Sequence, residues 1–356
     1  MAKKILKTAL IVIGIIVLLV AILFAWLSIT EFKPDEIMDT EITVNEDLEE
    51  TNLAVGDSIS VISWNIGYAG LGKESDFFMD GGEEVAAADE DTVNSYLNSI
   101  YDFLYLKNDA DVYMLQEVDE DSTRTYHINE KEYLGIFNSS YAYNYKCPFV
   151  PYPLPPIGTV NSGLLTTTRY TVDAAERVAL PCPFKWPVSI ANLKRCMMVS
   201  YLPIKDSDKQ LVVINFHLEA YDDGEGKIAQ TKLLLDFIEQ EYEKGNYVIA
   251  GGDWNQTFPG SRGVYPNKFN DLWNPGSIEN IVLPEGWQLC YDLTVPSCRL
   301  LNQPYDENDV ENTQYYVIDG YVISPNLQLD SVYTMDIGFK FSDHNPVKLQ
   351  VTLLDK

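Results

Sequence analysis

Residues able to do acid–base or metal chemistry recur where strand-like stretches of this chain end. Each such residue alone is common as a cap or turn residue. Asp319 is different, because it interrupts the apolar stretch YYVIDGYVIS, where a carboxylate has to be paired or hydrogen-bonded. The other positions are Asn65 in SWNIG, Gln116 and Glu117 in MLQEV, His217 in NFHLEAY, Asp253 and Asn255 in GGDWN, and Asp343 and His344 in FSDHNP.

Three of these residues suit a divalent cation. Asn65, Glu117 and Asp343 carry hard oxygen ligands of the kind that Mg²⁺, Mn²⁺ or Ca²⁺ bind, and Mg²⁺ usually keeps several waters as well. The five cysteines form no CxxC pair and the three histidines do not cluster in the sequence, which argues against zinc. The sequence therefore predicts a site for Mg²⁺, or for Mn²⁺ or Ca²⁺ in its place.

The remaining residues suit proton transfer and stabilisation of charge. Asp253, with Asn255 two positions later, can deprotonate and position a water molecule. His217 and His344 can donate to a phosphoryl oxygen on which charge develops. A buried Asp319 can hold one of these histidines in a single tautomer and raise its pKa. Together with the cation, this set is equipped for metal-assisted hydrolysis of a phosphoester.

Seven motifs, taken in chain order, resemble those of the endonuclease/exonuclease/phosphatase superfamily. They are N at 65, QE at 116–117, SGLL at 162–165, HLEA at 217–220, GDWN at 252–255, IDGYV at 318–322 and SDHNP at 342–346. A single motif such as SDH is not specific to the family. Seven motifs in the family order, each in a fitting strand context, are highly specific. The similarity runs from about residue 58 to residue 353.

This resemblance implies the fold and the metal ligands. The expected fold is a four-layer α/β sandwich, in which two mixed β-sheets pack face to face with helices outside. The site would lie at one rim, where the loops at the strand ends converge. Glu117 would ligate the metal, with Asn65 and Asp343 in or near its coordination shell.

The resemblance also implies catalytic roles. Asp253 would activate or orient the attacking water, assisted by Asn255. His344, oriented by Asp319, would contact the scissile phosphate, and His217 would contact it from the other side. Attack would be in line with the leaving oxygen.

Two departures from the family pattern narrow the choice of branch. Gly67 does not supply the extra carboxylate that some family nucleases carry just after the position of Asn65. His217 fits the deoxyribonuclease and sphingomyelinase branches, whereas apurinic endonucleases have Asn there.

Arg124 and Arg195 are candidate phosphate contacts, and a purely structural or solvated role is the alternative for both.

Alternating strand-like and helix-like segments are expected to position these residues within one α/β domain. Two segments rich in Pro or Gly, 147–160 and 258–288, are read either as binding loops or as surface decoration. The helices are expected at 92–107 and 227–244, the second of them capped by Gly245. Strands are expected at 58–66, 111–118, 163–170, 195–204, 210–218, 246–251, 314–323, 329–336 and 346–354.

The N-terminus reads as a single-pass membrane anchor. Lys3, Lys4 and Lys7 precede residues 8–30, which carry no charge. A helix of that length spans roughly 34 Å, enough for the ~30 Å hydrocarbon layer. Basic residues before the span and acidic residues after it predict a cytoplasmic N-terminus and an extracytoplasmic remainder. A cleaved signal peptide is the alternative, although the apolar run is longer than is typical and no A-x-A site follows it.

Composition limits the partners of the exported part. The chain carries 25 basic and 53 acidic residues, a net charge of −28; without the three lysines before the span, the net charge beyond residue 30 is −31. This argues against a broad basic face for nucleic acid and predicts repulsion from anionic headgroups.

Residues 1–30 are expected to be cytoplasmic tip and anchor, 31–57 an acidic stalk, and 58–356 the catalytic domain. Cys290 and Cys298 are near enough in sequence to pair.

The function that these features favour is a membrane-anchored, extracytoplasmic, metal-dependent phosphoesterase. Its substrate would be a small phosphate ester, a lipid headgroup diester or a nucleic acid. Two alternatives from other classes stay open: an exported nuclease that degrades DNA or RNA, and a non-catalytic surface binding protein on the same scaffold. The membrane is the partner of the N-terminal helix, and no protein partner is indicated.

Overall fold

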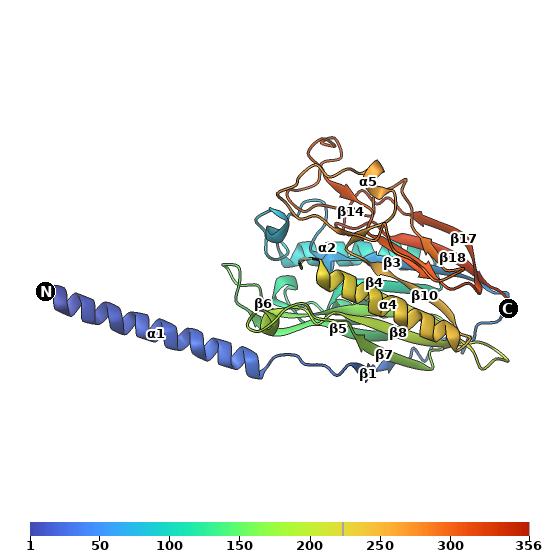
Figure 1. Cartoon of the computed structure of the whole chain (residues 1–356), viewed down its shortest axis with the longest axis horizontal. Coiled ribbons are helices and arrows are strands. Elements are labelled where there is room, and N and C mark those ends of the chain that lie inside the picture. The colour runs from blue at the N-terminus through green and yellow to red at the C-terminus, as the bar shows by residue number, and fades with distance from the viewer. Residues whose placement is uncertain (223, 356) are drawn as a thin grey trace.

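A computed structural model describes residues 1–222 and 224–355, and two seven-stranded mixed β-sheets packed face to face form its centre (Figure 1). Helices cover the outer face of each sheet, so the domain has four layers. This confirms the predicted α/β sandwich.

The first sheet contains the strands that carry Asn65 and Glu117. Its β3 and β4 run parallel, and every other neighbouring pair is antiparallel. The strand order is β17 (Leu327–Thr334), β18 (Val347–Leu353), β3 (Ser58–Asn65), β4 (Val112–Asp119), β6 (Gly158–Thr168), β5 (Asn138–Val150) and β2 (Ile42–Thr43).

The second sheet contains the strands that carry His217, Asp253 and Asp319. Among the described strands of this sheet, β9 and β10 run parallel, and every other neighbouring pair is antiparallel. The strand order is β1 (Ile37–Asp39), β7 (Ala174–Ala179), β8 (Cys196–Pro203), β9 (Gln210–His217), β10 (Tyr247–Asp253), β16 (Asp319–Ile323) and β13 (Gln288–Cys290).

Period-two alternation along the strands creates the layers. In β9, Leu211 and Val213 point into the core between the sheets, whereas Val212 and Ile214 point outward against helix α4 (Glu225–Glu243). Helix α2 (Glu90–Tyr101) and the short α3 (Glu130–Leu134) cover the outer face of the other sheet in the same way. Each fully buried aliphatic side chain contributes about 1.5–3 kcal/mol to holding the layers together.

The two predicted helices form, with local sequence signals at their ends. Asp89 accepts a hydrogen bond from the backbone N–H of Thr92 (2.7 Å) at the start of α2, and a π-helical turn, η3 (Asp102–Lys107), continues it. α4 ends just before Gly245, whose φ of +89° is the left-handed conformation that glycine adopts without strain.

Shorter elements connect these layers. The 3₁₀ turns are η1 (Gly67–Ala69), η2 (Phe78–Asp80), η4 (Thr123–Thr125) and η5 (Val188–Ala191); the remaining elements are α5 (Ser261–Val264), β11 (Gln256–Thr257), β12 (Gly276–Ser277), β14 (Cys298–Arg299) and β15 (Tyr315–Tyr316). All five cysteines lie within the described residues and are free, so Cys290 and Cys298 are not paired.

The strand predicted at 314–323 is wrong as one element. Tyr315–Tyr316 pairs with β14 in a separate two-stranded sheet, and the chain then enters the large sheet as β16. Asp319 is therefore the first residue of a strand and not an interruption within one. The break lets this carboxylate lie at the rim of the sandwich.

The segment 31–57, predicted as an acidic stalk, contributes a short strand to each sheet. β1 pairs with β7 and β2 pairs with β5, so this segment extends one edge of each sheet. Leu53 is fully buried in the core between the sheets. Backbone hydrogen bonds to the sheet edges hold the segment on the domain. Because these bonds do not depend on side-chain type, the segment shows little apolar periodicity in its sequence.

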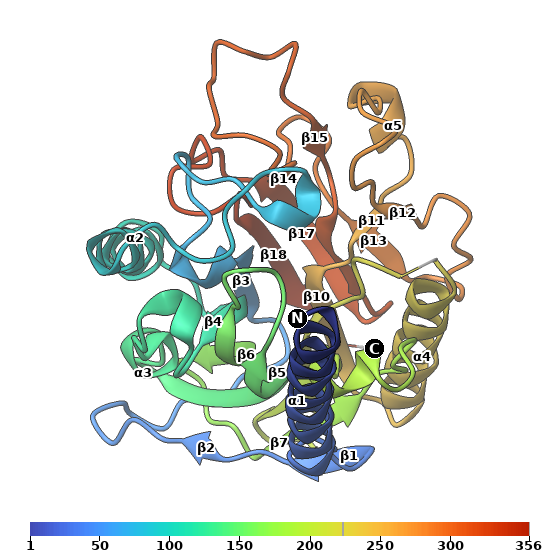
Figure 2. The same ribbon diagram turned by 90° about the vertical axis from the view of Figure 1, so that its left-hand side faces the viewer.

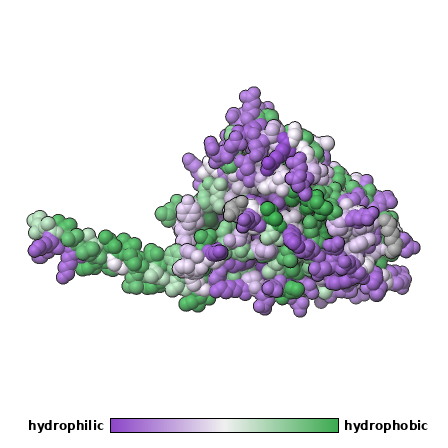
Figure 3. Space-filling view, in the orientation of Figure 1, coloured by the Kyte–Doolittle hydropathy of each residue, from purple (hydrophilic) through white to green (hydrophobic). Residues whose placement is uncertain are grey.

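Helix α1 (Ala2–Ile29) projects away from the sandwich as a single apolar rod (Figures 1 and 3). It is long and apolar enough to cross a membrane, and Leu27 is its one buried residue. A signal sequence near the N-terminus would have the same properties.

Candidate active site

Strand register brings the sequence-predicted residues to one rim of the sandwich. In the first sheet, parallel β3 and β4 place Asn65 beside Gln116. In the second sheet, Asp253 is the register partner of His217 on parallel β9 and of Asp319 on antiparallel β16. Because β16 begins where β9 and β10 end, all three side chains lie at the same edge.

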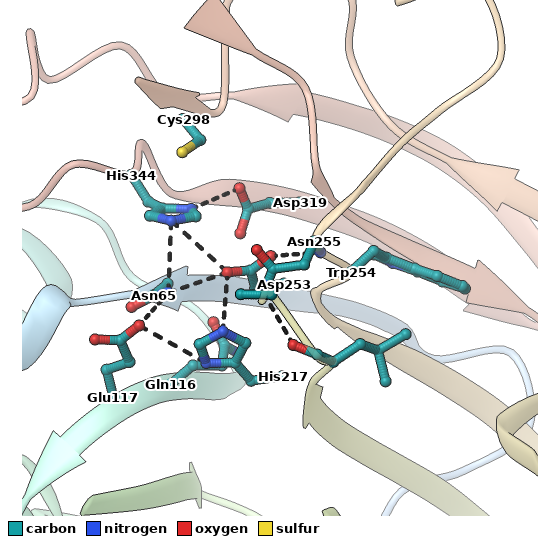
Figure 4. A network of polar contacts seen from close by, with 12 residues as sticks. Asn65, Gln116, Glu117, His217, Asp253, Trp254, Asn255, Cys298, Asp319 and His344 are labelled. Carbon is teal, nitrogen blue, oxygen red and sulfur yellow. Dashed lines mark hydrogen bonds and ion pairs between the residues drawn. The ribbon is translucent and has the colours of Figure 1, made fainter. Parts of the chain in front are cut away.

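Asp253 is the centre of this cluster (Figure 4). Its Oδ2 accepts a hydrogen bond from Asn65 Nδ2 (3.1 Å) and lies 3.3 Å from His217 Nε2 and 3.7 Å from His344 Nε2. Its Oδ1 accepts the backbone N–H of Asn255 (2.8 Å). A nearly buried carboxylate thus lies between two imidazoles that come from different parts of the chain.

Asp319 fixes one of those imidazoles. Its Oδ2 lies 2.8 Å from His344 Nδ1 and also accepts the hydroxyl of Ser297 (2.7 Å), whereas its buried Oδ1 has no hydrogen-bond partner among the described residues. With Nδ1 engaged as a donor to Asp319, His344 presents Nε2 to Asp253 and the cavity. Sequence reasoning missed Ser297, because no motif surrounds it.

Glu117 is held in an unusual backbone conformation. Its φ is +55°, in the left-handed region that non-glycine residues rarely adopt, and the pairing of β4 with β6 shifts register between Leu115 and Val118. The carboxylate then contacts Asn65 Nδ2 (3.1 Å) and lies 3.8 Å from His217 Nδ1. Such local strain is typical of residues that a site needs in one orientation.

Asp343 also belongs to the cluster, with its Oδ2 3.8 Å from His344 Nε2. Burial raises the pKa of Asp343 to about 7; His344 opposes this rise, and the charge of Glu117 adds to it. Gly67, at φ +52°, leaves room for the carboxylate, since a Cβ there would be 3.0 Å from Asp343 Oδ1. The glycine that lacks the extra carboxylate of some family nucleases therefore has a steric role here.

Burial and neighbouring charges shift the pKa values of the residues in this cluster. Burial raises the pKa of Asp253 to about 7, with His344 acting against the rise and Asp319 adding to it. Burial alone would lower the pKa of His344, but the surrounding carboxylates, Asp319 first, raise it well above its usual value. Burial, Arg195 and His344 together lower the pKa of His217. The pKa values of the two imidazoles are thus shifted in opposite directions, which favours the cationic form of His344 and the neutral form of His217.

The donor set fits a hard divalent cation. Glu117 and Asp343 are close enough for one to raise the pKa of the other, a repulsion that a cation between them would relieve, and Asn65 contributes an amide. Two triplets of ligand atoms lie within 4.8 Å of one another in the described part of the chain. Both include His344, whose Nδ1 already faces Asp319, so we prefer the oxygen ligands. The triplets are Asp253, Asp319 and His344, and Cys298, Asp343 and His344.

Both arginine candidates line the same cavity, but each already has a carboxylate partner. Arg124 forms a two-pronged ion pair with Asp119 (2.8 and 2.9 Å) and lies over the ring of Tyr68. Arg195 lies 3.6 Å from Glu219 and donates to the backbone oxygen of His217 (3.3 Å). These contacts support a structural role for both guanidinium groups, which also line the cavity.

A cavity of about 800 Å³ opens from this cluster. Asp80 lies in it, its Oδ1 accepting the hydroxyl of Tyr221 (3.0 Å), and burial raises the pKa of Asp80 to about 6. Tyr221 directly follows the HLEA motif, whereas nothing in the sequence around Asp80 indicates a site. Both segments that were read as binding loops or decoration contribute to the lining, through Tyr152 and Trp273.

Comparison with solved structures identifies the architecture. Neither a model of a protein family nor a curated protein matches the sequence. An endonuclease/exonuclease/phosphatase from Beutenbergia cavernae matches with a TM-score of 0.53 at 15% identity, over 83% of this chain and 72% of the other. One from Bacteroides vulgatus matches with a TM-score of 0.51 at 14% identity, over 83% and 99%. TDP2 from Caenorhabditis elegans matches with a TM-score of 0.50 at 16% identity, over 87% and 77%.

The chain therefore shares the fold of these endonuclease/exonuclease/phosphatase structures, which confirms the fold that the resemblance of its motifs implied. At these identities the likeness concerns the fold. What the site does has to be argued from its own residues.

Proposed function

We propose that this protein is a membrane-anchored, extracytoplasmic phosphoesterase that depends on a divalent cation. The observation that carries the proposal is the position of Asp253, a buried carboxylate within 3.7 Å of ring nitrogens of both His217 and His344. Two of the solved structures of similar fold bear the name endonuclease/exonuclease/phosphatase, which supports the same reaction class.

The residues divide the work of hydrolysis between them. Asp253 takes a proton from the attacking water, and the backbone N–H of Asn255 keeps its carboxylate in place. The water oxygen forms a bond to phosphorus as the bond from phosphorus to the leaving oxygen breaks on the opposite side. Cationic His344, oriented by Asp319, and neutral His217 donate to the phosphoryl oxygens as charge develops there.

Glu117, Asn65 and Asp343 would hold the divalent cation, which when bound supplies Lewis-acid stabilisation of the phosphoryl charge. The strained backbone of Glu117 fixes the direction of its side chain, and Gly67 leaves the space that the Asp343 carboxylate occupies. Mg²⁺ suits this oxygen-rich set, and Mn²⁺ or Ca²⁺ suits it as well.

Helix α1 and the charge distribution support the location. The three lysines before the apolar span favour a cytoplasmic N-terminus. The domain, with a net charge of −31 beyond residue 30, would then lie outside the cytoplasm.

The activity is tested with the full chain purified in detergent and a panel of soluble phosphate monoesters and diesters, with plasmid DNA as a further substrate. We expect Mg²⁺- or Mn²⁺-dependent release of product from a diester, and its loss with EDTA. Nicking of plasmid without hydrolysis of small esters would replace the proposal with a nuclease. Hydrolysis that EDTA leaves unchanged would contradict the metal assignment.

Replacement of Glu117 by Gln tests the cation site. The neutral amide keeps the size of the side chain but is a weaker ligand, so the Mg²⁺ concentration for half-maximal activity is expected to rise about 10- to 100-fold. Glu239→Gln, at an exposed position on α4, is the matched control and should leave the Mg²⁺ dependence unchanged. An unchanged Mg²⁺ requirement in the Glu117 variant would show that Glu117 is not a ligand of the cation.

A further inference from the structure

The end of α1 is packed onto the domain beside the cavity. Leu27 is buried, and the rings of Phe24 and Trp186 meet edge to face with centroids 6.4 Å apart. The Trp186 indole donates to the hydroxyl of Ser28 (3.1 Å). Two turns of the apolar helix therefore touch the catalytic domain, and the bilayer that α1 would cross begins at this contact.

The cavity connects this contact with the catalytic cluster. Its lining includes both Asp253 and His344 of the cluster and Phe24 and Leu27 of α1. Apolar side chains of the β5–β6 hairpin and of the segment around η5 also line it and form one apolar cluster with Leu27; among them are Val150, Ile157, Val160 and Ile190. A phosphate held at the cluster would thus have an apolar path leading toward the membrane helix.

Exposed apolar side chains surround the outer end of that path. Tyr152 and Leu154 at the tip of the β5–β6 hairpin are 70% and 87% exposed, and Trp186 and Val188 are 65% and 57% exposed. Figures 1 and 2 show α1 and this hairpin extending from the same side of the sandwich. Apolar groups gathered around an anchor helix are suited to the interfacial layer of a bilayer, where Trp and Tyr are enriched.

We infer that the substrate is a membrane lipid with a phosphate ester in its headgroup, drawn from the same bilayer that holds α1. The inference rests on the proposed phosphoesterase function and names its substrate class. The phosphate lies at Asp253, His217 and His344, and the acyl part lies along Ile157, Val160 and the α1 contact. A nucleic acid would place a polyanion against this apolar lining, and a small soluble ester would leave it unused.

The experiment uses the full chain reconstituted into vesicles of phosphatidylcholine, phosphatidylethanolamine, phosphatidylglycerol and sphingomyelin, with Mg²⁺. Mass spectrometry follows the loss of each lipid, and bis(p-nitrophenyl) phosphate reports the same active site without an acyl chain. Tyr152→Asp/Val188→Asp puts two charges on the apolar path at exposed positions. Val282→Asp/Val310→Asp makes the same change at exposed valines that do not line the cavity.

The first double variant is expected to lose about tenfold or more of its lipid hydrolysis, because a carboxylate on an acyl path is costly to desolvate. It should keep its activity on the soluble diester, and the control variant should keep both activities. Tyr152→Ser/Val188→Ser, which adds no charge, should show a smaller loss of the same kind, and equal melting temperatures would show that all variants fold.

Other outcomes separate this inference from the proposed function. Wild-type hydrolysis of the soluble diester without loss of any vesicle lipid would refute the lipid inference and leave the phosphoesterase standing. A double variant with unchanged lipid hydrolysis, or with equal losses on both substrates, would also refute it. Failure of the wild type on every substrate would refute the proposed function itself.

Discussion

Asp253→Asn is expected to lower turnover of a soluble phosphodiester by about 10³-fold, within the range of 10² to 10⁴ that a positioned acid–base group supplies. Asparagine has nearly the same shape and keeps an oxygen for the backbone N–H of Asn255, now 2.8 Å from Oδ1. It cannot accept a proton from water. The two histidines would then face an amide, and neither could replace the lost base from its present position.

The same variant is expected to fold as well as the wild type or better. Burial raises the pKa of Asp253 to about 7, so the ionised carboxylate is less favourable in the folded chain than in the unfolded one. That cost is absent at low pH and grows as the pH rises through the unfolded and folded pKa values. The neutral amide avoids it, so the melting temperature at pH 8 should not fall.

Exposed Asp271 provides the control, since Asp271→Asn makes the same change away from the cavity and should leave turnover unchanged. Steady-state kinetics at saturating Mg²⁺ and thermal unfolding measure both properties. If Asp253→Asn retained near wild-type turnover, the assignment of the base would be wrong.

Gly252→Ala is expected to destabilise the domain by about 3–5 kcal/mol, the range of severe core substitutions. Gly252 precedes Asp253 in β10 at a φ of +148°, and a Cβ there would lie 1.9 Å from the backbone oxygen of Phe216 in parallel strand β9. The backbone atoms of β9 cannot move aside as the end of a flexible side chain can. The strands would have to separate at the point where they place His217 beside Asp253.

Gly263→Ala is the matched control, because a Cβ at Gly263 would meet nothing within 4 Å. Urea unfolding followed by tryptophan fluorescence would compare the two variants, and the control should unfold close to the wild-type midpoint. Equal midpoints for both variants would show that the approach of β9 and β10 is looser than the structure has it.

The residues of the candidate site were easier to predict from the sequence than the strands that bring them together. Polar residues at the ends of apolar strands are a local signal, so Asn65, Glu117, His217 and Asp253 could be found without coordinates. That they share one rim depends on register between distant strands, such as Asp253 with Asp319. The motif order supplied that information through the family resemblance, and strand periodicity alone did not.

Elements held by backbone pairing were harder to predict. β5 (Asn138–Val150) contains Ser, Asn and Lys among its tyrosines, and β7 (Ala174–Ala179) has two charged residues, so neither was predicted as a strand. Both are stabilised by neighbours far along the chain. The edge strands of segment 31–57 were missed for the same reason. Asp80 could not be found because its importance comes from Tyr221 and the cavity alone.

The segment that follows α1 is fastened to the domain as well. Lys194 Nζ lies 2.9 Å from Glu31 Oε1, and Arg177 lies over the ring of Phe32. If α1 spans the bilayer, the catalytic rim is fixed in height and tilt over the lipid surface instead of swinging on a tether. An enzyme mounted in this way would search in two dimensions. Its rate would follow the mole fraction of substrate in the membrane and would be insensitive to dilution of the vesicles.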